Sequence, residues 1–131
     1  MNPNKLVQRL YLGDRYCTRI VIDNINSNFE LHLNSVYVMS NVELLEGRAK
    51  FNPTCDIENG AIVISQVERA IFDETGLALN DEIYDIIVKK VDINLYEFTI
   101  NGCNVNERAE ATDVTIKVYG KSVHLFNPQN N

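Results

Sequence analysis

The sequence lacks the features that define several large classes of protein. It has no tryptophan, and its 131 residues include only three prolines, six glycines, two histidines and three cysteines. No apolar run approaches the ~20 residues of a transmembrane helix, and the start, MNPNKLVQRL, has no apolar segment of the signal-peptide kind. Because the cysteines are odd in number and form no CxxC pair, we expect three reduced thiols and a cytoplasmic location.

Motifs for catalysis and for metal or phosphate binding are also missing. There is no glycine-rich phosphate loop, no G-x-S-x-G and no H-E-x-x-H. His32 and His124 lack partners at ligand spacing, and we expect His32 on the outward face of its strand. The segment 23–28 matches a calcium loop only in composition, because Ile25 takes the second ligand position and no glycine follows. We therefore expect no enzymatic activity, no metal and no cofactor.

The charge is acidic and unevenly distributed. The formal net charge is −6 and the pI is about 4.8, which argues against direct binding to nucleic acid or to an anionic membrane. Residues 1–52 hold six basic and five acidic residues, whereas residues 53–131 hold six basic and thirteen acidic residues. The acidic character therefore belongs to the C-terminal part, which favours a solvated surface or a basic partner.

The stretch from Leu95 to Phe126 organises the rest of the chain. Apolar and polar residues alternate from Tyr96 to Ile100 and again from Val114 to Val118, which is the pattern of half-buried strands. A polar segment, 104–113, with four charged residues separates the two runs. The pattern predicts two long antiparallel strands joined by an acidic loop.

The remaining segments predict more strands and one helix. Asn2 and Pro3 suit the start of a short helix whose apolar face extends to Tyr11. Strands are expected at 17–24, at 29–40 with a bulge at 34–35, and at 82–93 with both faces buried. Asn59-Gly60 predicts a hairpin turn, and 73–82 a loop. Segments 42–51 and 66–72 fit helix or strand, with strand favoured for the second.

These elements predict one domain over residues 1–131, mainly β in class. We expect an antiparallel β-sandwich or a partly open barrel of roughly eight strands with a short N-terminal helix.

Acidic residues in loops and at strand ends are the candidate binding residues, because such positions concentrate contacts with partners. The first cluster contains Asp73, Glu74, Asp81, Glu82 and Asp85. The second contains Glu107, Glu110 and Asp113. Composition alone favours a solvated face that keeps the protein in solution over a binding role.

Four segments resemble a known type of bacterial protein. They are NPNKLVQRLYLGDRYC at the start, YEFTI (96–100), TDVTIKV (112–118) and SVHL (122–125). Together they are similar to a family of small β-rich proteins of the immunity type, which are encoded beside polymorphic or contact-dependent inhibition toxins. The resemblance covers both ends of the chain and implies a cytoplasmic inhibitor that binds one toxin domain. No family motif assigns contact residues, so those named above are expected from charge and position.

The sequence thus predicts an immunity protein whose acidic surface fills the basic cleft of a toxin, with a nuclease as the expected toxin. The alternative is a β-barrel or sandwich module that binds a small apolar ligand. The two expectations place the functional residues differently, because the first needs exposed carboxylates and the second needs an apolar cavity.

Overall fold

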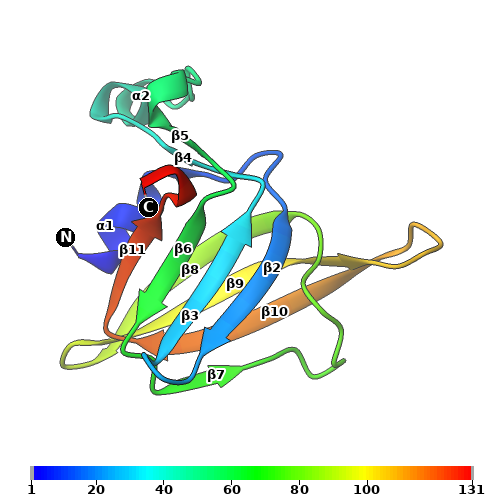
Figure 1. The fold of residues 1–131 in the computed structure, drawn as a ribbon. Helices are drawn as coiled ribbons and strands as arrows, with labels where there is room; N and C mark the ends of the chain where they lie inside the picture. The colour runs from blue at the N-terminus through cyan, green and yellow to red at the C-terminus, as the bar shows by residue number, and fades with distance from the viewer. Residues whose placement is uncertain (1, 131) are drawn as a thin grey trace.

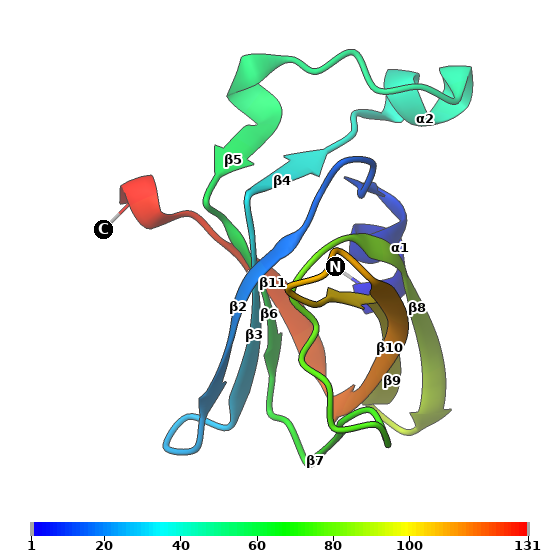
Figure 2. The ribbon, with the colours of Figure 1, turned by 90° about the vertical axis from the view of Figure 1, so that its right-hand side faces the viewer.

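Two four-stranded antiparallel sheets face each other, and a three-stranded sheet stands beside them (Figures 1 and 2). The structure is a computed structural model that describes residues 2–130. The first sheet contains, in spatial order, β7 (Arg69–Ile71), β10 (Ala111–Gly120), β9 (Leu95–Val105) and β8 (Ile83–Asp92). The second contains β11 (Ser122–Phe126), β6 (Ala61–Ser65), β3 (Asn28–Leu33) and β2 (Cys17–Asp23).

The small sheet contains β1 (Leu10–Tyr11), β4 (Ser35–Val38) and β5 (Asp56–Glu58). Two α-helices, α1 (Pro3–Gln8) and α2 (Asn41–Glu46), and two 3-10 turns, η1 (Pro53–Cys55) and η2 (Pro128–Asn130), complete the elements described within residues 2–130.

The fold confirms the predicted class, mainly antiparallel β with a short N-terminal helix, in the sandwich arrangement. Residues 2–130 contain eleven strands where roughly eight were expected. The difference comes from strands such as β1, β5 and β7, which have only two or three residues. A pattern of alternation cannot be recognised over so few positions.

The predicted pair of long strands, β9 and β10, forms the centre of the first sheet. Ile100 pairs with Ile116, and the ladder continues to Val105 and Ala111, so the connecting turn is shorter than predicted. Inward-facing side chains of this pair are buried against those of the second sheet, and the core includes Phe29, Leu31, Ile62, Ile64, Phe98, Ile100, Val114, Ile116 and Val118. Burying each large apolar side chain contributes about 1.5–3 kcal/mol.

Helix α1 begins as predicted but ends earlier. The Asn2 side chain accepts the Asn4 N–H at 2.8 Å, and Pro3 occupies the first turn. The predicted extension of the helix to Tyr11 is wrong, because Leu10 and Tyr11 form β1 and pair with β4. The apolar face is used nonetheless, since Val7 is buried and α1 lies against β8 and β11.

The segment 29–40 is divided between two sheets, and the predicted bulge at 34–35 is a bend. β3 pairs with β6 in the sandwich, while β4 pairs with β5 in the small sheet. The register is the same on both sides of the bend, and hydrogen bonds from Leu33 N–H to the Gly60 carbonyl (3.0 Å) and from Asn59 N–H to the Asn34 carbonyl (2.9 Å) join the two parts. The hairpin predicted at Asn59-Gly60 is therefore wrong, because this turn connects strands of different sheets.

Beyond the bend, the ladder continues into a separate part of the molecule, residues 34–59, which we call the α2 lobe. The ambiguous segment 42–51 begins with helix α2, which has a capping box between Ser40 and Glu43. Figures 1 and 2 show α2 and the small sheet at one end of the molecule, beyond the sandwich. The other ambiguous segment, 66–72, contains the strand β7, as favoured.

β8 is exposed where both faces were predicted to be buried. It is the terminal strand of its sheet, and Tyr84, Ile87 and Val91 are exposed. Its apolar residues on both faces predicted a central strand, but only the face with Ile83, Ile86 and Val88 packs on the core. That burial pattern is typical of an edge strand with one solvated face.

Candidate functional site

The two predicted acidic clusters lie at the same end of the first sheet. Asp85 pairs with Asn101, and Asp113 lies opposite Cys103, two residues farther along β9. Since Val114 points into the core, Asp113 and Thr115 point to the outer face. Glu107 and Glu110 lie farther along, in the β9–β10 turn, which extends beyond the other strands in Figure 1.

Asp73 is committed to the structure of the loop. Its Oδ1 accepts the Thr75 N–H (3.0 Å) and hydroxyl (2.6 Å), and its Oδ2 accepts the Thr115 N–H (2.8 Å). These hydrogen bonds hold the pKa of Asp73 below its ordinary value, and the bond from the Thr75 side chain has the largest effect. The carboxylate thus ties the start of the 73–81 loop to β10 and extends the sheet beyond β7.

Asp85 also has a partner within the sheet. Its Oδ1 accepts the Asn101 side-chain N–H at 2.7 Å, and the Asn101 Oδ1 accepts the Thr115 hydroxyl at 2.8 Å. Asp85, Asn101 and Thr115 therefore form a hydrogen-bonded row across β8, β9 and β10. The row holds the Asp85 carboxylate at an exposed position on the outer face.

Glu74 and Asp81 lie along the loop rather than with the other carboxylates. Glu74 is exposed and lines a shallow concavity with Phe72, Thr115 and Lys117. Asp81 is half-buried, and its backbone carbonyl accepts the Cys17 N–H at 2.9 Å. We define the acidic end as the remaining exposed carboxylates, namely Glu82, Asp85, Glu107, Glu110 and Asp113.

Two exposed tyrosines flank the acidic end, and the sequence analysis did not identify them. Tyr16 pairs with Glu82 through an isolated bridge and is 46% exposed, and Tyr84 is 48% exposed. The pKa of Tyr84 is raised to about 12, first by a hydrogen bond with Cys103 and by desolvation, and further by the charges of Asp113 and Glu82. Tyr84 was hidden because it was assigned to a strand buried on both faces.

The β9–β10 turn has a fixed shape. Asn106 Oδ1 accepts the N–H groups of Arg108 (2.9 Å) and Glu110 (3.0 Å), and the Asn106 side-chain N–H reaches Glu110 Oε1 at 3.2 Å. The Asn80 side chain adds two hydrogen bonds to the backbone of Val105, at 2.8 and 3.2 Å. A polar concavity of about 550 Å³ lies here, and its lining includes Asn80, Asn106, Glu107, Arg108 and Glu110. The hairpin thus presents its carboxylates from a rigid support.

A second, apolar pocket of about 570 Å³ lies between β2 and the 72–80 segment. It differs from the acidic end in polarity, because its lining includes the apolar side chains of Ile20, Ile22, Phe72, Leu79 and Ile116. The chain approaches β9 closely beside it, since a Cβ at Gly102 would lie 2.6 Å from Leu79 Cδ1.

The histidines and cysteines do not form a reactive cluster. His32 is buried, contrary to the predicted outward position, and its Nε2 lies 2.8 Å from Glu30 Oε1. All three cysteines are free thiols, as predicted. Across residues 2–130, no three His, Cys, Asp or Glu side chains are placed to hold a metal ion. None of the helices described in that range is long and apolar enough to cross a membrane.

A family model described as "Family of unknown function (DUF6258)" matches residues 1–131 of the chain. No curated protein and no solved structure matches the chain.

Proposed function

We propose that this chain, which belongs to the DUF6258 family of unknown function, is an immunity protein that binds and neutralises a bacterial toxin domain in the cytoplasm. The observation that carries the proposal is the acidic end, where five exposed carboxylates from β8, β10 and the two adjoining loops lie at one end of a sheet. Arg108 is a basic residue in the β9–β10 turn, but the surface is mainly acidic, and a mainly acidic surface on a rigid support favours a basic partner.

The charge of the acidic end indicates a toxin with a basic cleft. A nuclease needs such a cleft because it binds the phosphates of its substrate. The β9–β10 turn extends beyond the neighbouring strands, so its carboxylates can enter a cleft that a flat surface could not (Figure 1). Glu107 and Glu110 would then occupy the positions of substrate phosphates. The protein would act by occupying the cleft, without chemistry of its own.

Charge and contact have separate roles in this proposal. Carboxylates at the rim accelerate association, toward ~10⁸ M⁻¹s⁻¹ at low salt, and their effect is screened over ~10 Å at 0.1 M salt. Tyrosines are enriched among the residues that contribute most to binding energy. Tyr16 and Tyr84, beside Glu82, are therefore the contacts expected to limit dissociation.

The direct test is protection of cells from the C-terminal domain of the protein encoded immediately upstream. The toxin domain is expressed from an inducible promoter, with and without this protein, and survival is counted. An acidic-end variant replaces four carboxylates by amides, at Glu82, Glu107, Glu110 and Asp113. Asp85 is left intact because Asn101 holds it. The matched control makes the same change of charge at four other exposed positions, Asp14, Glu46, Glu58 and Glu68.

We expect the control to protect like the parent and the acidic-end variant to lose protection. Association of the purified proteins should slow by about tenfold or more at low salt, and the difference should shrink as salt rises. Equal protection by the two variants would show that the acidic end is only a solvated surface. Failure of the parent itself to bind or protect would refute the immunity proposal for that toxin.

A further inference from the structure

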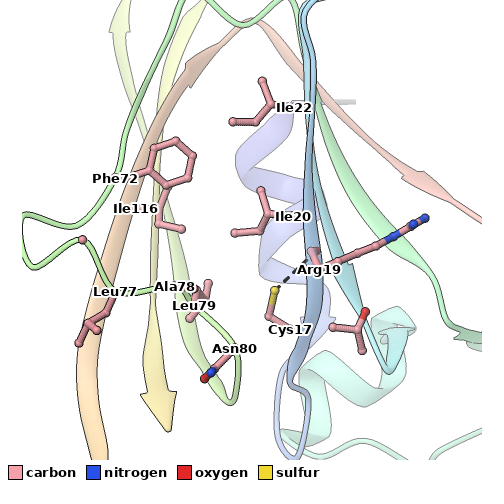
Figure 3. Close-up of a pocket in the computed structure, with 12 residues that line it drawn as sticks. Cys17, Arg19, Ile20, Ile22, Phe72, Leu77, Ala78, Leu79, Asn80 and Ile116 are labelled. Atoms are coloured by element: carbon pink, nitrogen blue, oxygen red, sulfur yellow. Dashed lines mark hydrogen bonds between the residues drawn. The ribbon is translucent and has the colours of Figure 1, made fainter. Parts of the chain in front are cut away.

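The apolar pocket lies where the two sheets of the sandwich separate. Figure 3 shows β2 on one side, and β10 with the 72–80 segment on the other. Ile20 and Ile22 extend from β2 into the gap, and Phe72 and Ile116 face them from the opposite wall. The volume of about 570 Å³ falls within the range of ligand sites, roughly 300–1,000 Å³.

The lining is suited to a neutral molecule. Among the residues that the structure describes, Arg19 is the one charged residue that lines the pocket, and its side chain points away from the gap in Figure 3. The Cys17 thiol points inward and hydrogen bonds to the Arg19 carbonyl, with Sγ and O 3.6 Å apart. Burial raises the pKa of this thiol to about 11, so it is uncharged. An ionic ligand would lose its hydration here without gaining an opposite charge.

The wall formed by the loop is fixed at several points. Asp73 anchors its start to Thr115, and the Asn104 side chain donates to the Ala78 carbonyl at 2.7 Å. At the far end, the Asn80 side chain binds Val105, and the Asp81 carbonyl accepts the Cys17 N–H. Because the loop is held on both sides of the gap, the pocket is preformed, which reduces the ordering that a ligand must impose.

The pocket also offers hydrogen-bonding groups along one side. β2 is the terminal strand of its sheet, and among the strands described in residues 2–130 its ladder is with β3; past Cys17, whose N–H the Asp81 carbonyl accepts, its other edge is free. In an antiparallel strand, the backbone N–H and C=O groups of alternate residues point toward each edge. The free edge of β2 can therefore pair with one or two polar groups of a ligand, in a site whose lining is mainly apolar. This combination is typical of small-molecule sites.

We propose that this pocket binds a neutral hydrophobic small molecule, held between Ile20 and Ile22 of β2 and Phe72 and Ile116 of the opposite wall. Ile22 is 51% exposed and Phe72 is 46% exposed, so an occupant would remove apolar surface from water on both walls. The site uses no residue of the acidic end. It therefore goes beyond the immunity proposal and does not depend on it.

The test is a fluorescence titration of the full chain with N-phenyl-1-naphthylamine, a neutral hydrophobic dye. The parent should bind it saturably, with one dye per chain. In Ile22→Lys, an ammonium group replaces part of the apolar wall, and the dissociation constant should rise at least ~tenfold. The matched control is Ile25→Lys, the same change at a 93% exposed position in the β2–β3 turn, which should bind like the parent.

A second variant tests the volume of the pocket rather than its polarity. Ala78→Trp adds a large side chain at an exposed lining position, and it should also weaken dye binding at least ~tenfold. Circular dichroism should show the parent fold for all three variants. Absence of saturable binding by the parent, or equal binding by parent, Ile22→Lys and Ala78→Trp, would overturn the proposal.

The immunity proposal and the pocket proposal are refuted by different results. The acidic-end variant should keep parent affinity for the dye, and Ile22→Lys should still protect cells from the toxin. Loss of protection in Ile22→Lys, with dye binding abolished as well, would overturn the assignment of two independent sites and make the pocket part of the toxin-binding surface.

Discussion

The sandwich and the α2 lobe belong to one continuous ladder, yet different forces hold them. In the sandwich, the core residues of β3 and β6 pack on those of β9 and β10. In the lobe, Val42, Leu45 and Phe51 are exposed, and Leu45 is 89% exposed. The lobe also buries one carboxylate, that of Glu43. Past the bend, apolar burial continues in β4, where Val36 is 2% and Tyr37 0% exposed, but α2 and the chain after it are held to β4 by a polar network.

The network has Glu43 at its centre. One oxygen, Oε2, accepts the Tyr37 hydroxyl and the Lys50 N–H, each at 2.6 Å, and Oε1 accepts the Ser40 N–H at 3.0 Å. The Tyr37 hydroxyl in turn accepts the Asn52 N–H at 3.0 Å. These bonds tie the start of α2, the chain after it and β4 to one side chain. An apolar core distributes its stabilisation over many contacts, whereas here a single substitution removes several.

The largest expected effect is in the sandwich. Phe98→Ala removes a ring that is 1% exposed at the centre of the core, and it should lower the free energy of unfolding by about 3–5 kcal/mol. Denaturant unfolding followed by circular dichroism measures the loss. Protection from hydrogen exchange should fall in both the sandwich and the lobe, because the lobe strands continue from β3 and β6. Unchanged protection in the lobe would mean that it folds independently.

Glu43→Gln should weaken the lobe while sparing the sandwich. A neutral amide cannot accept all the hydrogen bonds that now converge on the carboxylate, and a charged acceptor makes the stronger bonds. Hydrogen exchange should quicken in residues 40–55 and stay unchanged in β9 and β10. Glu58→Gln, at an exposed position in β5 of the same lobe, is the control and should leave both regions unchanged. Loss of protection from hydrogen exchange throughout the chain would contradict the distinction between the lobe and the sandwich.

The same carboxylate predicts a pH dependence of the lobe. Hydrogen bonds, that of Tyr37 first, lower the pKa of Glu43 from 4.5 to about 2. A lowered folded-state pKa stabilises the folded form above the ordinary value, and this stabilisation is lost as pH falls from 4.5 through about 2. Protection of residues 40–55 should decrease over that interval in the parent. The dependence should be absent in Glu43→Gln, and its persistence would assign it to another group.

The same contrast explains how much of the fold could be predicted. Alternation identified β2, β9 and β10, because inward side chains such as Phe98 and Ile116 recur at period two. In the lobe, β4 was predicted as part of the strand 29–40, but helix α2 was left undecided, since its exposed Leu45 and buried Glu43 reverse the usual relation between polarity and burial. Asn59-Gly60 marked a real turn, but sequence alone could not assign the strands beside it to different sheets.

For the candidate site, the sequence showed which residues are charged but not where they lie relative to one another in the fold. Charge marked every carboxylate of the acidic end, but only the strand register shows that Asp85 and Asp113 lie opposite residues of β9 that are two positions apart. Charge alone could not show that Asp73, unlike Asp85 and Asp113, is used to hold the loop, because its hydrogen bond to Thr115 joins residues distant in sequence. An apolar ligand site was the alternative that the sequence left open, but its lining could not be predicted, because Ile22 and Phe72 meet only through the packing of two sheets.

A smaller effect is expected at the start of α2. The Ser40 hydroxyl accepts the Glu43 N–H at 3.2 Å, and Ser40→Ala removes this cap. Loss of an N-cap of this type costs about 1 kcal/mol. Hydrogen exchange of the first turn of α2 should quicken, with β9 and β10 unchanged. Ser40→Asp, which restores a capping oxygen, should recover most of the protection, and failure to recover would point to packing rather than capping.

The smallest effect is expected from a polar contact on the sandwich itself. The Tyr119 hydroxyl donates to Glu97 Oε2 at 2.6 Å across β9 and β10. Tyr119→Phe should cost only about 0.2–1 kcal/mol, as for other cross-strand pairs, because the contact is half-exposed and water can replace it. Tyr37→Phe deletes the same atom from an equally short bond, at a side chain that is 0% exposed. Denaturant unfolding should show little change for Tyr119→Phe, and hydrogen exchange should show an opened lobe for Tyr37→Phe. Equal effects of the two deletions would mean that burial does not distinguish the polar contacts of the lobe from those of the sandwich.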